Sequence, residues 1–293
     1  MIDADAYAVL LADWCLDVQP DQQILVLGTT LAEELGVALH RAILERGAWP
    51  HLRLSPAGLE ADFYHHAQER HLDGFAPLSL LEFESVDASL RIEAPATDGL
   101  AGIDPSLPMR AARARRPLQR ARLARRWAVA IWPTPVLAQH ARMPLADYEA
   151  FVERALFLDR ASPVSAWREL SARQAQLVQR LDSAEIIRIE NQHTDLTLNV
   201  AGRRWQNSDG RRNMPSGEVF TSPHEQSANG TIVFDLPSME WDAPVSGVRL
   251  EFADGQVVAA HAEVGDEHLQ AALAIDDGAR FLGEIGIGTN TGI

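Results

Sequence analysis

The chain has 293 residues and a formal net charge of −15, with 26 basic and 41 acidic side chains. All the basic residues are arginine, so there is no lysine for a Schiff base, for pyridoxal phosphate or for a phosphate-binding loop. The acidic balance argues against a nucleic-acid partner, which needs a basic surface. With 46% hydrophobic residues, the composition is that of a globular protein with a sizeable core.

The single cysteine, Cys15, excludes an intramolecular disulfide and any multi-cysteine zinc site. Its neighbours are apolar, so we interpret it as a small buried hydrophobic residue. The N-terminus lacks the basic and apolar regions of a signal peptide, and no apolar run approaches the ~20 residues of a membrane helix. We therefore expect a cytoplasmic protein without a membrane partner.

The first half of the sequence alternates between helical and extended patterns. Thr30 is a plausible N-cap for the second helix, and Gly47 is suited to end it. Strands and helices in alternation imply crossover connections, hence an α/β fold with a doubly wound, mostly parallel sheet. The predicted strands are 24–27, 51–54, 88–92 and 127–132, and the predicted helices are 5–16, 31–46 and 59–70.

An arginine-rich stretch over 105–125 is predicted to be a long helix, interrupted or restarted near Pro117. Few aromatic residues are interleaved with the arginines, which disfavours nucleic-acid binding. We interpret them as a solvated face that pairs with carboxylates, within the chain or across a subunit interface. The cluster is Arg110, Arg113, Arg115, Arg116, Arg120, Arg122, Arg125 and Arg126.

After two further helices, predicted over 145–156 and 163–181, the pattern changes near residue 182. Asp254-Gly255 between two alternating apolar runs is a strong hairpin signal. We predict an α/β N-terminal domain over 1–182 and a β-rich, α+β catalytic-type domain over 183–293. The second domain is predicted to hold strands at 186–189, 196–198, 230–234, 248–252 and 256–261, and short helices at 266–274 and 276–282.

Several candidate sites are weak. His65, His66 and His71 miss the i,i+4 spacing with which two imidazoles share one ion on a helix. The glycines of 283–288 are not followed by a helix, as a dinucleotide-binding loop would be. No Gly-x-Ser-x-Gly motif is present, which lowers the odds of a serine hydrolase.

Two carboxylates stand in unusual settings. Glu218 follows a proline- and glycine-containing turn and leads into apolar residues, and Glu284 lies between Gly283 and Gly286 among apolar neighbours. Such an acid is either a charge at the edge of a sheet or a functional group directed into a cavity. Two converging carboxylates would suit a hard divalent cation or acid–base chemistry.

The segments around these glutamates also resemble the M29 family of metallo-aminopeptidases, the thermophilic-aminopeptidase or AmpS/PepS-like family. The resemblance is carried by PSGEVFTSPHEQSANGTIVFD (215–235), VSGVRLEFADGQVVAAHAEVGDEHLQ (245–270) and DDGARFLGEIGIGTNTGI (276–293). Upstream landmarks in the expected order are 14–28, 103–105, 131–135 and 193–205, so the resemblance covers essentially the whole chain.

The resemblance implies an exopeptidase that removes N-terminal residues from peptide substrates with two divalent metal ions (Zn, Co or Mg). It implies that Glu218 and Glu284 are metal ligands and that the protein is a homodimer enclosing the active cavity. The family pattern continues into a segment that supplies two histidines, an aspartate and a tyrosine. Those positions lie beyond Ile293, so the catalytic residues stay unknown and the second domain is expected to be incomplete relative to the family.

His261 and His268 are nearby in the sequence and are weak candidates to replace the family histidines. Two alternatives to an aminopeptidase follow. One is a truncated, non-catalytic homologue that acts as a dimeric peptide- or partner-binding protein. The other is an iron-dependent ring-cleaving dioxygenase of related fold.

Overall fold

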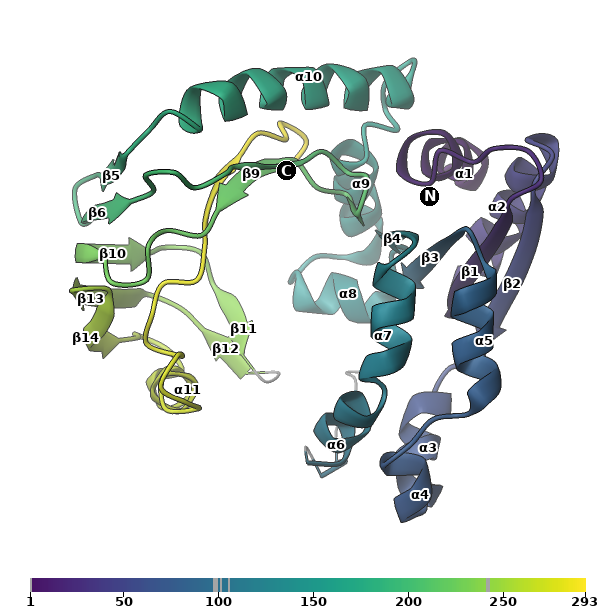
Figure 1. The fold of residues 1–293 in the computed structure, drawn as a ribbon, viewed down its shortest axis with the longest axis horizontal. Helices are drawn as coiled ribbons and strands as arrows, with labels where there is room; N and C mark the ends of the chain where they lie inside the picture. Colours follow the sequence, from purple (N-terminus) through teal and green to yellow (C-terminus); the bar gives the residue numbers. More distant parts are fainter. Residues whose placement is uncertain (1, 97–99, 101, 105, 241–242) are drawn as a thin grey trace. The chain divides into compact units, whose positions relative to one another are not determined.

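A computed structural model describes residues 2–96, 100, 102–104, 106–240 and 243–293 (Figure 1). Its contacts divide the chain into two compact units. The first unit comprises Met1–Leu170, Ser208–Gly217 and Asn290–Ile293, and the second comprises Ser171–Asn207 and Glu218–Thr289. The division into domains 1–182 and 183–293 stays a prediction, because a compact unit is not the same as a domain that folds alone.

The first unit contains a five-stranded parallel sheet, as the alternating pattern predicted. Its strands are arranged in the order β2-β1-β3-β4-β8. Ile24, Leu25 and Val26 of β1 are fully or almost fully buried, as expected for a parallel strand covered on both faces. The strands are β1 (Gln23–Thr29), β2 (Trp49–Ser55), β3 (Ala88–Glu93), β4 (Arg126–Ile131) and β8 (Asn213–Met214).

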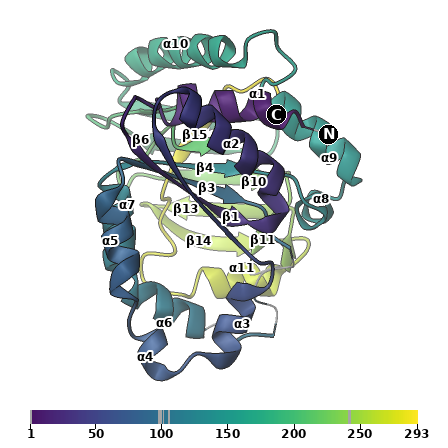
Figure 2. The ribbon, with the colours of Figure 1, turned by 90° about the vertical axis from the view of Figure 1, so that its right-hand side faces the viewer.

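The chain reverses its direction across this sheet between β1 and β3. From β1 it moves outward to β2, and from β2 it returns past β1 to β3 and then β4. Because such crossovers are right-handed, helices before and after the reversal cover opposite faces, which is the doubly wound arrangement. Figure 2 shows α1 beside α2 and α5 beside α7.

The helices of the first unit largely follow the predicted pattern. The prediction of Thr30 as an N-cap is wrong: Thr30 begins a 3₁₀ turn (Thr30–Ala32), and α2 starts after Ala32. The helices are α1 (Ala4–Leu10), continued by a π-helical turn (Leu11–Cys15), α2 (Glu33–Glu45), α3 (Leu59–His66), α4 (Glu69–Leu72), α5 (Pro77–Ser85), α6 (Ser106–Ala114), α7 (Arg116–Leu123), α8 (Pro135–His140) and α9 (Leu145–Ala155). The long helix α10 (Pro163–Leu181) begins in the first unit and ends in the second.

The arginine-rich stretch forms two helices that are separated at Arg115, and Pro117 lies in the first turn of the second helix, so the interruption predicted near Pro117 is confirmed. Pro105, its predicted first residue, lies outside the described residues. The Arg110 guanidinium binds Asp73 at 2.5 Å and also Glu69, and it lowers the pKa of Asp73. Arg122 stacks on Trp127, 5.1 Å from the ring centre. These arginines therefore pair with carboxylates and aromatic rings of the chain itself.

Residues 208–217 return to the first unit between the two stretches of the second, which the sequence did not predict. The indole of Trp14 donates a hydrogen bond to the carbonyl of Asp209 at 2.8 Å, and the thiol of Cys15 donates to the carbonyl of Gly210 at 3.2 Å. Cys15 is almost completely buried, as its neighbours indicated, and this burial raises the pKa of its thiol. These bonds fix the segment that adds β8 to the sheet.

Gly210 is required at this anchor. Its φ is +88°, and a Cβ would lie 2.7 Å from the terminal methyl of Met214 and 3.0 Å from the Trp167 ring. We expect Gly210→Ala to lower the free energy of unfolding by about 2–4 kcal/mol, from backbone strain together with overpacking. Chemical denaturation followed by far-UV circular dichroism measures the change.

Gly58→Ala is the matched control, because Gly58 also has a positive φ, +84°, but its Cβ would meet no atom within 4 Å. It should lose about 1–2 kcal/mol, from strain alone. Equal losses at the two positions would contradict the packing role of Gly210.

The second unit is built from antiparallel strands, as the change of pattern near residue 182 indicated. One sheet has the order β14-β13-β10-β6-β5, a second has the order β15-β9-β7, and β11 pairs with β12. The strands are β5 (Ile186–Glu190), β6 (Asp195–Asn199), β7 (Gln206–Ser208), β9 (Glu218–Thr221), β10 (Asn229–Phe234), β11 (Ser238–Glu240), β12 (Ala243–Val245), β13 (Val248–Ala253), β14 (Gln256–His261) and β15 (Ile285–Gly288).

The predicted hairpin at Asp254-Gly255 is confirmed. Both residues have positive φ, +48° and +85°, as the tight turn between β13 and β14 requires. The helix predicted over 266–274 is α11 (Asp266–Ala272). The helix predicted over 276–282 is wrong: the Asp276 carboxylate accepts the backbone N–H groups of Gly278 and Ala279, both at 2.9 Å, and holds this segment in turns.

Among the described residues, none of the helices is both long and apolar enough to cross a membrane.

Candidate metal-binding site

The two candidate glutamates lie on neighbouring strands of the second unit. Strands β9 and β15 are antiparallel, with Glu218 opposite Gly288, Phe220 opposite Gly286 and Thr221 opposite Ile285. Side chains alternate between the two faces of a sheet, so Glu218 and Phe220 share a face with Gly286 and Gly288. The other face is packed into the core, where Val219 and Thr221 are almost completely buried.

Glu218 begins β9 and is half-buried. Its side chain lies over Gly286: a Cβ built on that glycine would be only 2.7 Å from the Glu218 carboxylate Oε2. Its carbonyl oxygen accepts a hydrogen bond from Gln174 Nε2 at 2.7 Å, which anchors the backbone to α10. The carboxylate thus occupies the space that the missing side chain of Gly286 leaves open.

Glu284 directly precedes β15 and is exposed. It is two residues before Gly286, so the alternation of side chains directs it to the face on which the Glu218 carboxylate lies. Two residues of extended chain span about 7 Å. The Glu218 side chain thus lies over Gly286, two residues after Glu284, and the alternation predicts that both carboxylates share one face.

The two carboxylates are the type of ligand that a divalent metal ion binds. Carboxylate oxygens are the donors that hard divalent cations take, and zinc accepts them as well. They do not fit in number, since each cation needs three or four ligands. Throughout the described ranges, no group of three or more His, Cys, Asp or Glu side chains is arranged to hold a metal.

The histidines considered in the sequence do not supply the further ligands. His261 lies 3.5 Å from Asp266, and His268 lies 3.7 Å from Glu267. In the first unit, His66 lies beside Asp62 on one turn of α3, and His71 accepts the backbone N–H of Gln68. Each of these imidazoles has a local partner, consistent with the interpretation of 65, 66 and 71 as surface histidines.

Two residues that shape this site were missed in the sequence. Gly286 was considered as part of a possible dinucleotide loop and as a neighbour of Glu284, although alternating glycines at 286 and 288 are also the signal of a strand face without side chains. Gln174 has no sequence signal, because its bond to Glu218 depends on how α10 packs on β9.

A third missed residue, Asn290, holds the backbone that precedes Glu218. Its side-chain amide donates to the carbonyl of Ser216 at 2.8 Å and to the carbonyl of Ala155 at 2.9 Å, and its backbone N–H donates to the carbonyl of Gly217. A Cβ on Gly217 would be 2.5 Å from the Cβ of Asn290, so this approach requires the glycine. Asn290 therefore fixes Ser216 and Gly217 from within the first unit.

The family model of the thermophilic metalloproteases (M29) matches residues 3–293. The chain belongs to this family. The resemblance to the M29 family that the glutamate motifs indicated is thereby confirmed. The chain is a member of a metallo-exopeptidase family that uses divalent metal.

The curated relatives of this M29 chain are aminopeptidases. Aminopeptidase 2 of Geobacillus stearothermophilus is 30% identical, over 97% of this chain and 76% of the relative. Aminopeptidase T of Thermus aquaticus is 31% identical, over 75% of this chain and 60% of the relative. The chain thus spans about three quarters and about three fifths of the lengths of these two relatives.

Two solved structures share the fold. Wild-type AmpT from Thermus thermophilus has a TM-score of 0.82 at 24% identity, covering 97% of this chain and 77% of that one. A 2,5-dihydroxypyridine dioxygenase from Pseudomonas putida KT2440 has a TM-score of 0.58 at 14% identity, covering 98% and 77%. The α/β fold class predicted from the sequence is confirmed by the first of these.

Gly286→Ala should displace the Glu218 carboxylate and leave the fold intact, because the atom that the new methyl meets is the free end of a flexible side chain. We expect divalent-metal affinity to fall about tenfold, as for residues that position ligands. The free energy of unfolding should change by less than about 1 kcal/mol. Isothermal titration calorimetry with Co²⁺ and chemical denaturation measure the two quantities.

Gly288→Ala is the control, since it lies on the same strand and the same face, and its Cβ would meet nothing within 4 Å. Equal metal affinities for the two variants would show that Gly286 does not position the carboxylate.

Proposed function

We propose that the protein is a metal-dependent aminopeptidase that hydrolyses N-terminal residues from peptides at a dinuclear divalent-metal site, to which Glu218 and Glu284 contribute. The observation that carries the proposal is the Glu218 carboxylate lying over Gly286, two residues after Glu284 on the partner strand's segment. Membership of the M29 family supports it.

The role of the two glutamates is to hold the divalent cations at a fixed position. The pairing of β9 with β15 fixes both backbones, and the bond from Gln174 fixes the carbonyl of Glu218. Divalent cations held there would act as Lewis acids toward the scissile carbonyl and would make water a better nucleophile near neutral pH. Two glutamates do not complete the coordination of two ions, and the described residues hold no group of three or more His, Cys, Asp or Glu that would supply the other ligands.

Peptide substrates carry a free N-terminal ammonium group. An acidic chain, with a net charge of −15, favours the approach of such cationic ends. The resemblance to the family supports zinc, cobalt or magnesium as the ions and a homodimer as the assembly. The sequence features described above support the cytoplasm as the compartment.

The protein expressed from its full coding sequence should release the N-terminal residue of leucyl peptides in the presence of Co²⁺, Zn²⁺ or Mg²⁺ and lose this activity on chelation. Glu218→Gln and Glu284→Gln should each lower kcat/KM more than about 100-fold, because substitutions that only position metal ligands already cost 10–100-fold. Release of free leucine is followed by amine derivatisation and chromatography.

Glu185→Gln, at an exposed glutamate of the same unit, is the matched control and should keep full activity. If no metal supports release, but peptides still bind, the alternative of a non-catalytic, dimeric peptide- or partner-binding homologue replaces the proposal. The dioxygenase alternative has a distinct signature, which is stoichiometric iron and consumption of oxygen with a dihydroxylated ring substrate.

The homodimer has its own test. Light scattering after size-exclusion chromatography should give twice the mass of one chain, unchanged by Glu218→Gln, because that substitution leaves the fold in place. A monomer at every concentration would contradict it.

A further inference from the structure

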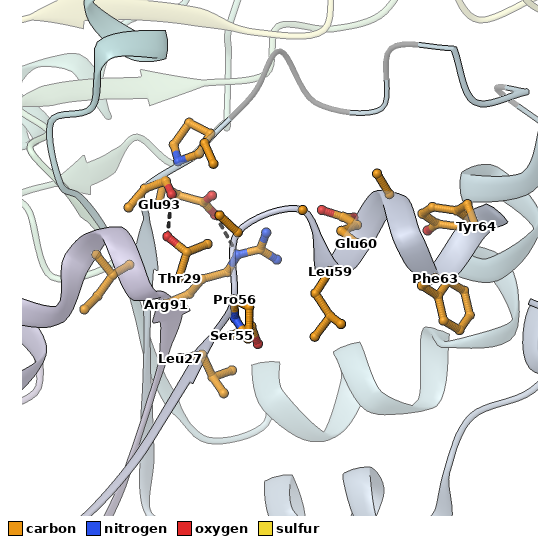
Figure 3. A pocket seen from close by; sticks show the side chains of 18 of the residues that line it. Leu27, Thr29, Ser55, Pro56, Leu59, Glu60, Phe63, Tyr64, Arg91 and Glu93 are labelled. Atoms are coloured by element: carbon orange, nitrogen blue, oxygen red, sulfur yellow. Dashed lines mark hydrogen bonds and ion pairs between the residues drawn. The ribbon is translucent and has the colours of Figure 1, made fainter. Parts of the chain in front are cut away.

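The first unit holds a pocket with a volume of about 530 Å³. It lies at the carboxyl ends of β1, β2 and β3, lined by Thr29, Ser55 and Glu93 among others (Figure 3). This is where the chain reverses direction across the sheet, between β1 and β3. Open α/β sheets bind ligands at such a reversal, and the volume is in the range of small-molecule sites.

Two of the charged groups in this pocket neutralise each other. Arg91 and Glu93 form an ion pair with an Nε–Oε1 distance of 2.7 Å (Figure 3). Because their charges cancel, Arg91 and Glu93 make the pocket polar but do not favour a charged ligand.

The other two charged groups have no such partner. The Arg115 guanidinium stacks on the ring of Phe63, 4.7 Å from its centre, and forms no ion pair with a described carboxylate. Glu60, in the first turn of α3, forms no ion pair with a described arginine or histidine. Among the described residues, therefore, a cation and an anion that have no ion-pair partner line the same pocket.

Both groups line the same pocket, and both are related to helix α3. Glu60 and Phe63 are three residues apart on α3, so they project from the same face of the helix, with Cβ atoms about 5–6 Å apart. Arg115 is stacked on the ring of Phe63, the residue that follows Glu60 by one helical turn. Figure 3 shows Glu60, Leu59 and Phe63 along α3, across the pocket from Leu27 of β1. Leu27, Leu59 and Ile92 supply apolar surface.

A nucleotide does not fit this arrangement. Gly28 is followed by threonines rather than by the spaced glycines of a phosphate-binding loop. The first turn of α2 carries Glu33 and Glu34, and that of α3 carries Glu60, so both helix starts repel an anion.

We propose that this pocket binds a zwitterion with an apolar side chain, that is, a free amino acid or a short peptide. Its carboxylate binds Arg115, its ammonium group binds Glu60, and its side chain packs on Leu27, Leu59 and Ile92. The pocket is formed entirely by residues of the first unit, whereas Glu218 and Glu284 belong to the second. The site is thus additional to the proposed peptidase site.

The test is isothermal titration calorimetry with three ligands of one shape and different charge, in the presence of chelator. L-Leucine has both charges, L-leucinamide lacks the carboxylate, and 4-methylpentanoate lacks the ammonium group. We expect L-leucine to bind at least about tenfold more tightly than either of the others, since each loses one charge-assisted bond.

Variants of the two charged residues assign each bond. Glu60→Gln should lower the affinity for L-leucine to that for 4-methylpentanoate, and Arg115→Gln should lower it to that for L-leucinamide. Arg116→Gln is the control, because Arg116 neighbours Arg115 without lining the pocket, and it should leave binding unchanged.

Equal binding of all three ligands, or leucine binding that survives both substitutions, overturns the proposal. Loss of leucine binding in Glu218→Gln but not in Glu60→Gln would place the ligand at the peptidase site, which overturns this inference and leaves the proposed function standing. Conversely, leucine binding without any peptidase activity would support this site and count only against the proposed function.

Discussion

The antiparallel pairing of β9 with β15 is the constraint on which the candidate site depends. Glu218 and Glu284 are 66 positions apart in the sequence, and the register of these two strands places the Glu218 carboxylate over Gly286, two residues after Glu284. A shift of one residue would turn Glu284 into the core, because side chains alternate with a period of two. The buried Val219 and Thr221 oppose such a shift, since it would expose them. The burial of Val219 and Thr221 on one face of the sheet thus determines which side chains lie on the opposite face.

Much of this fold could be predicted, because its signals are local. Alternating apolar runs identified β1 to β4, Pro117 marked the break between α6 and α7, and Asp254-Gly255 marked a hairpin. In each case the residue itself restricts the backbone, as the proline ring and the positive φ of an Asp-Gly turn do. The two glutamates were proposed from sequence motifs, and their part in a metal site stays a prediction.

The failures have a common physical cause, which is competition from contacts or bonds that the local pattern does not contain. The Asp276 side chain captured two backbone N–H groups and replaced a helix with turns. Strand β8 is two residues long, and it exists because Trp14 and Cys15 hold the preceding segment. Gly286 lies beneath the Glu218 carboxylate because of the pairing with β9, and the residues around Gly286 in the sequence do not reveal that pairing.

The first unit is assembled from three separate stretches of chain, and the second from two. No single break in the polypeptide therefore separates them. A fragment ending at Leu170 would keep four strands of the parallel sheet, but β4 would lose its neighbour β8, and the Trp14 indole would lose its acceptor. A fragment starting at Ser171 would carry stretches that belong to the other unit. The first unit can be completed only when Asn290–Ile293 have been synthesised, and the second only when its last stretch, Glu218–Thr289, has been synthesised.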